Sequence, residues 1–146
     1  MIALIQRVSE AQVRINGVVV GAIRRGLLAL IGVRHGDDDQ AVVRLLERLL
    51  SYRVFADADG RMNLSLTDIE GGLLLVPQFT LAADTKKGAR ASFHTAATPA
   101  EAERLFALLV QRAQSSYPAV YAGVFGADMQ VSLVNDGPVT FWLETP

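Results

Sequence analysis

The chain has 146 residues, of which 51% are hydrophobic and 20% charged, and its formal net charge at pH 7 is −1. This length and composition indicate one compact globular domain over 1–146 and exclude an intrinsically disordered chain. The net charge excludes a global field that draws the protein to nucleic acid or membrane, so any RNA contact is expected to be local, and the absence of cysteine excludes disulfides and thiolate chemistry.

Two strands joined by a tight turn are predicted at the N-terminus. β-Branched residues and alternation mark 2–15 and 18–33, and Asn16-Gly17 between them is a strong signal for a two-residue hairpin. A second turn at Arg25-Gly26 starts a third strand, which is almost wholly apolar and therefore expected to be buried on both faces. The early charges Arg7 and Glu10 argue against a secretory signal, and no apolar run is long enough to span a membrane. We therefore expect a cytoplasmic protein without a membrane partner.

Two main helices are predicted. The first follows three aspartates at 37–39, which suit the positive end of a helix, and it carries an apolar stripe at Val42, Leu45, Leu46, Leu49 and Leu50. The second starts with Thr98 as the cap, Pro99 in the first position and Glu101 completing a capping box. Its buried face is expected to comprise Ala102, Leu105, Phe106, Leu109, Val110 and Ala113.

The remaining segments have the composition of strands. They are 53–57, 71–81, 120–125 and 129–134, with a further strand-like stretch after Pro138. Because strands outnumber helices, we predict an α+β fold in which the two helices pack on one side of a mostly antiparallel sheet or open barrel.

A calcium loop at 55–65 is excluded, although acidic and amide side chains alternate there. With Asp57 counted as the first position, the glycine falls at the fourth position and not the sixth, and the twelfth residue is Asp68, where a bidentate glutamate would be required. A hairpin turn at Asp59-Gly60 is the better interpretation. His35 and His94 are far apart in sequence, so we expect no metal and no cofactor.

The stretch 76–93 is richer in candidate functional groups. A strand with Gln78 and Thr80 runs into a loop that carries Lys86, Lys87 and Arg90. This pattern suits either a site for a phosphate-bearing ligand or an ordinary solvated loop. Thr80 could act as a nucleophile, orient a water or substrate, or be a plain strand residue, since no spacing to a histidine or aspartate matches a known triad.

Gly137-Pro138 interrupts a segment that otherwise has the composition of a strand. Proline donates no ladder hydrogen bond and glycine weakens a strand interior. Two interpretations of Gly137-Pro138 remain open. The pair forms a tight turn, or its main-chain atoms have a functional role.

Five stretches together resemble one known family. They read ALIQRVSEAQV, GLLALIGV, RMNLSLTD, QFTLAADTKKG and FGADMQVSLVNDGPVTFWL, in the family's order and along essentially the full length. On these residues the chain resembles the bacterial-type D-aminoacyl-tRNA deacylases. The combination of QFTLAAD with NDGPVT is the most specific part of the match.

The resemblance implies an activity and an assembly. The family hydrolyses the ester between a D-amino acid and the terminal adenosine of tRNA, and it removes glycine mischarged on the alanine tRNA, Gly-tRNA(Ala). It works as a homodimer with active sites at the interface, without a metal. The Gly137-Pro138 peptide bond is then cis and enters the partner's pocket, where the two carbonyls bind the α-ammonium group and exclude an L side chain.

Further roles follow position by position from the same resemblance. Gln78, Phe79 and Thr80 line the adenosine and the ester, and the Phe79 N–H donates to the ester carbonyl. Arg7 braces the Gly–Pro carbonyls, and Met129 packs against the motif. The 2′-hydroxyl of the adenosine assists the attack of water.

The chain departs from the family pattern at Pro77, where serine is usual, and at Ala91, where proline is usual. Proline before glutamine also occurs in a related branch that removes L-alanine from threonine tRNA, whereas Phe79 and Arg7 favour the D-specific branch. The alternatives are therefore an editing deacylase with that L-alanine preference and a non-catalytic tRNA-binding dimer.

Overall fold

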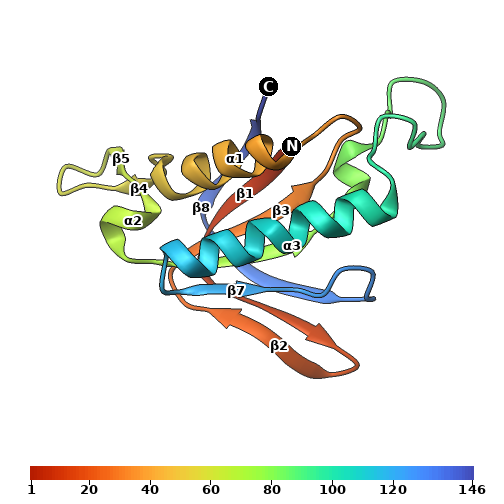
Figure 1. Cartoon of the computed structure of the whole chain (residues 1–146). Coiled ribbons are helices and arrows are strands. Elements are labelled where there is room, and N and C mark those ends of the chain that lie inside the picture. Colours follow the sequence, from red (N-terminus) through yellow and green to blue (C-terminus); the bar gives the residue numbers. More distant parts are fainter.

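The computed structural model describes all residues, 1–146, as one sheet with helices on it and a separate small hairpin (Figure 1). The elements are β1 (Ile2–Ile15), β2 (Val18–Ile23), β3 (Gly26–Gly32), α1 (Asp39–Ser51), β4 (Phe55–Ala56), β5 (Met62–Leu64), α2 (Leu66–Ile69), β6 (Gly72–Pro77), the 3-10 turn η1 (Phe79–Ala82), α3 (Pro99–Ser116), β7 (Val120–Ala122) and β8 (Gln130–Glu144).

The six-stranded sheet is built around the long strand β1. The strand order is β2-β1-β3-β6-β7, and β8 pairs with β1 along its other edge. The pairs of β1 with β2, β3 and β8 are antiparallel, whereas β3–β6 and β6–β7 are parallel. The parallel pairs arise because helical segments connect these strands and return the chain to the same end of the sheet. The predicted α+β class and mostly antiparallel sheet are confirmed.

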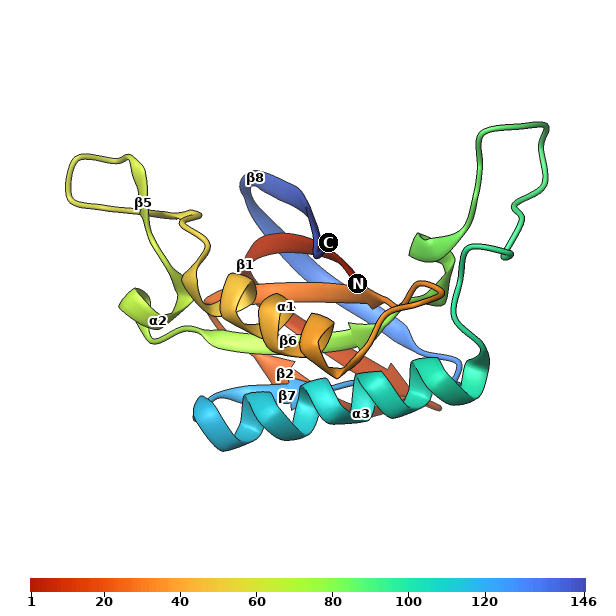
Figure 2. The same ribbon diagram turned by 45° about the horizontal axis from the view of Figure 1, so that its top comes forward.

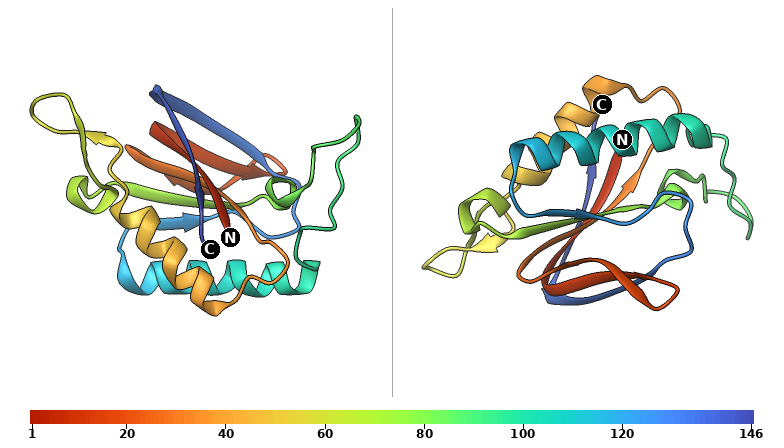
Figure 3. Two further views of the ribbon diagram at one scale, coloured as in Figure 1. Left: turned by 90° about the horizontal axis from the view of Figure 1, so that it is seen from above. Right: turned by 60° about the horizontal axis from the view of Figure 1, so that its bottom comes forward.

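The two long helices lie side by side on one face of the sheet, as predicted (Figures 1 and 3). Their apolar stripes and alternate strand residues form the main core, which includes Ala3, Ile5, Leu27, Ala29, Ile31, Leu45, Leu49, Leu73, Leu75, Leu105 and Leu109. The strand residues that point to the other face form a second, smaller cluster, which includes Val8, Leu28, Leu74 and Val76. Strand β3 is thus buried on both faces, as its apolar sequence predicted.

The start of α3 differs from the prediction in one respect. The Thr98 hydroxyl accepts a hydrogen bond from the Glu101 N–H at 3.3 Å, but the Glu101 carboxylate binds Arg104 at 2.6 Å and does not return to the cap. Arg104 satisfies the carboxylate better because the bond joins two charged groups. A complete capping box occurs instead between Ser65 and Asp68 at the start of the short helix α2, which the sequence analysis missed.

The predicted strand over 71–81 is too long. Strand β6 ends at Pro77. The next residue, Gln78, still donates its N–H to the Ile31 carbonyl at 2.7 Å, and Phe79–Ala82 then form a 3-10 turn. The turn brings Leu81 so close to β3 that a Cβ on Gly32 would lie 3.0 Å from the Leu81 Cβ. Strand β7 is also shorter than its predicted range of 120–125, ending at Ala122.

Two segments project from opposite ends of the sheet (Figure 2). One is the β4–β5 hairpin, where the Asp57 carboxylate accepts from the N–H groups of Asp59 and Arg61 and from the Asn63 amide. These bonds lower the pKa of Asp57 and show that its acidic pattern builds a turn. The other is the loop between η1 and α3, which carries the basic residues. None of the helices combines the length and apolar character that crossing a bilayer requires.

Candidate functional site

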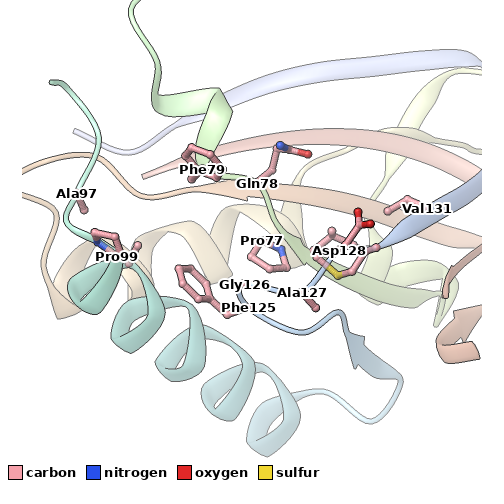
Figure 4. Close-up of a pocket in the computed structure, with 13 residues that line it drawn as sticks. Pro77, Gln78, Phe79, Ala97, Pro99, Phe125, Gly126, Ala127, Asp128 and Val131 are labelled. Atoms are coloured by element: carbon pink, nitrogen blue, oxygen red, sulfur yellow. The ribbon is translucent and has the colours of Figure 1, made fainter. Parts of the chain in front are cut away.

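A largely apolar cavity of about 490 Å³ opens at the end of the sheet where β6 stops. Pro77, Pro99 and Phe125 gather around it, and Asp128 supplies the one charged side chain of its lining (Figure 4). The lining residues are Val76, Pro77, Gln78, Phe79, Ala97, Pro99, Ala102, Phe125, Gly126, Ala127, Asp128, Met129 and Val131. Apolar walls with few polar groups are typical of sites for small organic groups.

Met129 forms part of this wall. Its sulfur accepts the Val124 N–H at 3.4 Å and lies so close to Gly123 that a Cβ there would be 2.7 Å away. The same added Cβ would lie 3.5 Å from Pro77 Cδ. The absence of a side chain at Gly123 therefore leaves room for the thioether, which fixes Met129 in the wall of the cavity.

The η1 turn brings hydrogen-bond donors to the cavity rim. Phe79 is the first residue of the turn, so its N–H has no partner inside the turn, and no side chain caps it. The Phe79 ring is 58% exposed and lies against Phe93, with the ring centroids 5.1 Å apart. An unused N–H and an exposed aromatic surface thus lie side by side at the rim.

Thr80 is placed next to the cavity but does not line it. Its hydroxyl oxygen accepts from the Gln78 amide at 2.5 Å, and that amide is its hydrogen-bond partner in the chain. His94 is instead bonded to Ser92 at 2.8 Å and lies 3.9 Å from Asp84. The structure therefore brings no base to Thr80, which argues against a nucleophilic role.

Lys86, Lys87 and Arg90 lie on the exposed loop that joins η1 to α3, and both of these elements contribute residues to the cavity lining. None of the three forms an ion pair, and the Lys86 N–H is held by the Asp84 carboxylate at 3.0 Å. Bonds between Asp84 and Ser92 close the base of this loop. The loop next to the cavity therefore carries three cationic side chains that have no acidic partner.

The Gly137–Pro138 peptide bond is cis, as the resemblance implies, and it lies within strand β8. Arg7 packs beside it, donating from Nε to the Asp136 carbonyl at 2.9 Å and from Nη1 to the Val54 carbonyl at 2.8 Å. The brace thus acts on the residue before Gly137. The simple tight turn that the sequence left open is not what forms, because β8 continues on both sides.

The cavity and the Gly–Pro pair of one chain lie apart on the sheet. Gly137 and Pro138 lie opposite Arg7, which is level with Leu27 and Leu73, whereas the cavity lining on β6 begins at Val76. Three residue steps along β6 correspond to about 10 Å, and the three strand spacings from β8 across β1 and β3 to β6 correspond to about 14 Å, so the direct separation is about 17 Å. Met129 therefore does not meet the motif of its own chain.

Several lining residues were not anticipated as functional. Pro99 and Ala102 were assigned only to the start of α3, and Asp128 was given no role. They come from separate segments that only the fold brings together, so no local pattern signals them. No group of three or more histidine, aspartate or glutamate side chains is arranged to hold a metal ion.

Comparison with known proteins yields consistent matches. The family model described as D-Tyr-tRNA(Tyr) deacylase matches residues 4–144. The chain is 65% identical over 146 residues to a D-aminoacyl-tRNA deacylase of Thioalkalivibrio sulfidiphilus, covering 100% of this chain and 98% of the relative. It is 65% identical over 144 residues to one of Alkalilimnicola ehrlichii, covering 99% and 96%.

Solved structures agree with these matches. A structure named c-Myc DNA Unwinding Element Binding Protein has a TM-score of 0.95 at 36% identity, covering 100% of this chain and 99% of the other. A structure described as a probable eukaryotic D-amino acid tRNA deacylase has the same fold, with a TM-score of 0.77 at 19% identity and coverage of 99% and 98%.

Proposed function

Because the chain belongs to the D-Tyr-tRNA(Tyr) deacylase family, we propose that it is a hydrolase that cleaves the ester of D-aminoacyl-tRNA, releasing free D-amino acid and tRNA. The observation that carries this proposal is the 65% identity to a D-aminoacyl-tRNA deacylase over the whole chain. The relevant compartment is the cytoplasm, where aminoacyl-tRNA is used.

The cavity rim supports a simple chemistry for this reaction. A water oxygen attacks the ester carbonyl carbon, the bond from that carbon to the ribose oxygen breaks, and the water proton ends on the ribose oxygen. The free N–H of Phe79 is the donor that stabilises the negative charge on the carbonyl oxygen during the attack. Gln78, held against Thr80, orients the substrate, and the 2′-hydroxyl of the terminal adenosine assists the water.

Selection against L-amino acids is assigned to Gly137 and Pro138. Their carbonyls accept the α-ammonium group and fill the space that an L side chain needs. Since the pair and the cavity of one chain are about 17 Å apart across the sheet, a second copy must supply the motif to each cavity, which supports a homodimer. Met129, at the cavity mouth, then packs against the partner's motif. Glycine has no side chain to exclude, so Gly-tRNA(Ala) is also a substrate.

The exposed loop gives the tRNA a place to bind. Lys86, Lys87 and Arg90 contact backbone phosphates near the acceptor end, since they lack acidic partners and stand beside the cavity mouth. The contact adds affinity without reading sequence.

Two other functions have an observation in their favour. Pro77, which lines the cavity, is shared with the branch that removes L-alanine from threonine tRNA. The 36% identical structure is named as a DNA-binding protein, which favours a non-catalytic nucleic-acid-binding dimer.

Incubating the purified protein with D-Tyr-tRNA, L-Tyr-tRNA and L-Ala-tRNA(Thr) separates these functions. We expect release of D-tyrosine and no release from either L substrate. Binding of D-Tyr-tRNA without hydrolysis favours the non-catalytic dimer, and cleavage of L-Ala-tRNA(Thr) alone favours the related editing activity. Equal cleavage of both tyrosyl forms contradicts selection by handedness.

A further inference from the structure

The segment that contains Gly137 and Pro138 leaves the ladder between β8 and β1. Gln6 pairs with Thr140 and Val8 pairs with Asn135, so residues 136–139 all stand opposite Arg7 alone. A strand segment without ladder partners needs other contacts to define its conformation.

The Asn135 carboxamide provides these contacts on one side. Its Oδ1 accepts the Val139 N–H at 3.0 Å, and its Nδ2 donates to the Thr140 hydroxyl oxygen at 2.9 Å. The amide orientation is fixed, because the backbone N–H of Val139 can only donate. The Asn135 side chain thus links the last paired residue before the unpaired segment 136–139 to Val139 and to Thr140, where pairing resumes.

A second side chain supports the same hydroxyl. Gln6 Nε2, on the paired strand β1, lies 3.4 Å from the Thr140 oxygen. Since Arg7 also donates to the Asp136 carbonyl, the unpaired segment is held at its first residue, Asp136, and at its last, Val139. Gly137 and Pro138 remain as the two residues between these fixed points, and both are exposed.

We propose that Asn135 is a positioning residue that sets the direction of the Gly137 and Pro138 carbonyls and thereby the discrimination between D- and L-aminoacyl esters. The inference rests on the proposed function, because discrimination has meaning only for a deacylase. Asn135 does not touch the substrate. It acts by holding the Val139 N–H and the Thr140 hydroxyl, so that the Gly–Pro carbonyls keep one orientation.

The chemistry of asparagine explains why other residues at this position would be poorer. The position requires an acceptor toward Val139 and a donor toward Thr140 from one short side chain. Aspartate keeps the acceptor but has no donor at neutral pH, and alanine has neither. Valine at 140 removes the oxygen that both amides share, while serine keeps it.

The test compares Asn135→Ala, Asn135→Asp, Thr140→Val and Thr140→Ser, with Gln114→Ala, an exposed carboxamide on α3, as the matched control. The first readout is the ratio of kcat/KM for D-Tyr-tRNA over L-Tyr-tRNA. We expect Asn135→Ala to lower this ratio at least tenfold, Asn135→Asp and Thr140→Val to lower it less, and Thr140→Ser and Gln114→Ala to keep it.

The second readout is the hydrogen-exchange protection of the Val139 amide, which does not depend on activity. We expect protection in the unsubstituted protein and in Asn135→Asp, and loss in Asn135→Ala. An unchanged D-to-L ratio in Asn135→Ala overturns the proposal, as does an unchanged Val139 protection. If Asn135→Ala does not fold, the D-to-L ratio of kcat/KM in Asn135→Asp and Thr140→Val tests the proposal, and an unchanged ratio in both overturns it. Failure of the unsubstituted protein to cleave D-Tyr-tRNA rejects the proposed function, while the exchange readout still tests the hydrogen bonds.

Discussion

Gly137 has a backbone conformation and a crowded setting that together require glycine. Its φ is 140°, and an added Cβ would lie 2.7 Å from Val139 Cγ2 and 3.1 Å from Arg7 Nη2. We expect Gly137→Ala to shift the carbonyls of the motif and to lower kcat/KM for D-Tyr-tRNA by roughly tenfold or more, since small misplacements at a reacting centre are costly. Steady-state deacylation assays measure this loss.

Gly60→Ala is the matched control for Gly137→Ala. Gly60 also has a positive φ, 78°, but nothing lies within 4 Å of an added Cβ. The change should cost about 1 kcal/mol of unfolding free energy and leave deacylation unchanged. Equal activity of the two variants would contradict the role of the crowded contacts at Gly137.

The N–H of Phe79 can be removed without removing the turn. Proline is tolerated at the first position of a helical turn, where the N–H has no partner in the turn. Phe79→Pro should lower kcat by about two to three orders of magnitude beyond Phe79→Ala, since both variants lose the ring but only one loses the donor. Single-turnover rates at saturating protein give the comparison. Similar rates for the two variants would exclude the N–H as the stabilising donor.

At the scale of elements, Tyr117 ties the end of α3 to the segment around α2. Its buried hydroxyl lies 2.5 Å from the Gly71 carbonyl and 3.2 Å from the Leu66 carbonyl. Tyr117→Phe should lower the unfolding free energy by about 1–3 kcal/mol, because the buried Gly71 carbonyl loses its donor. Urea denaturation at pH 7 measures the difference.

The loss of stability caused by Tyr117→Phe should also depend on pH. Burial raises the pKa of the Tyr117 phenol above its usual value of 10. Because the folded state holds this proton more tightly than the unfolded state, the stabilisation is complete below pH 10 and is lost as pH rises through the folded pKa. The stability difference between the unsubstituted protein and Tyr117→Phe should therefore shrink above pH 10. A difference that grows there would contradict the assignment.

Sequence patterns predicted those elements whose signals are local. The Asn16-Gly17 hairpin has Asn16 at φ 49° and Gly17 at φ 77°, as its turn type requires. The η1 turn was missed because Phe79, Thr80 and Leu81 are compatible with a strand, and only packing against Gly32 bends the chain there. Strand β8 was predicted as two separate strands. An unpaired segment that side chains hold within one strand, such as 136–139, has no signature in the local sequence.

The candidate site was predictable only in part. Gln78 and Gly137–Pro138 stood out in the sequence pattern and Phe79 was named through the resemblance, but the bonds of Asn135 and the approach of Phe125 and Asp128 to the cavity depend on contacts between distant segments. No periodicity or spacing encodes such contacts.

At the scale of the whole molecule, a net charge of −1 provides no global attraction for tRNA, so under the proposed function we expect the attraction to come from the exposed basic loop. Replacing Lys86, Lys87 and Arg90 together by alanine should raise KM and reduce the slope of log KM against log salt concentration by about two units. Arg112→Ala is the control, since Arg112 is exposed on α3 and forms no ion pair. KM measured from low to moderate salt tests this, and an unchanged slope in the triple variant would place the tRNA elsewhere.

The separation of cavity and motif predicts complementation between two defective chains. Phe79→Pro removes the N–H donor at the cavity but leaves the Gly–Pro motif intact. Gly137→Ala disturbs the motif but leaves the cavity intact. In a mixed dimer, the motif of the first chain enters the intact cavity of the second, so one of its two sites is whole. Random pairing of equal amounts makes half of the dimers mixed, and activity should recover to roughly a quarter of the unsubstituted level.

Co-expression followed by assay on D-Tyr-tRNA measures the recovery, and the double variant Phe79→Pro/Gly137→Ala mixed with unsubstituted chains is the control for pairing. A mixed dimer of these two chains has no whole site, because the intact cavity receives a spoiled motif and the intact motif enters a spoiled cavity. Activity then comes only from dimers of two unsubstituted chains, roughly a quarter of the total. If each site were completed within one chain, this control would instead keep half of the activity, and the two single variants would show no recovery on mixing.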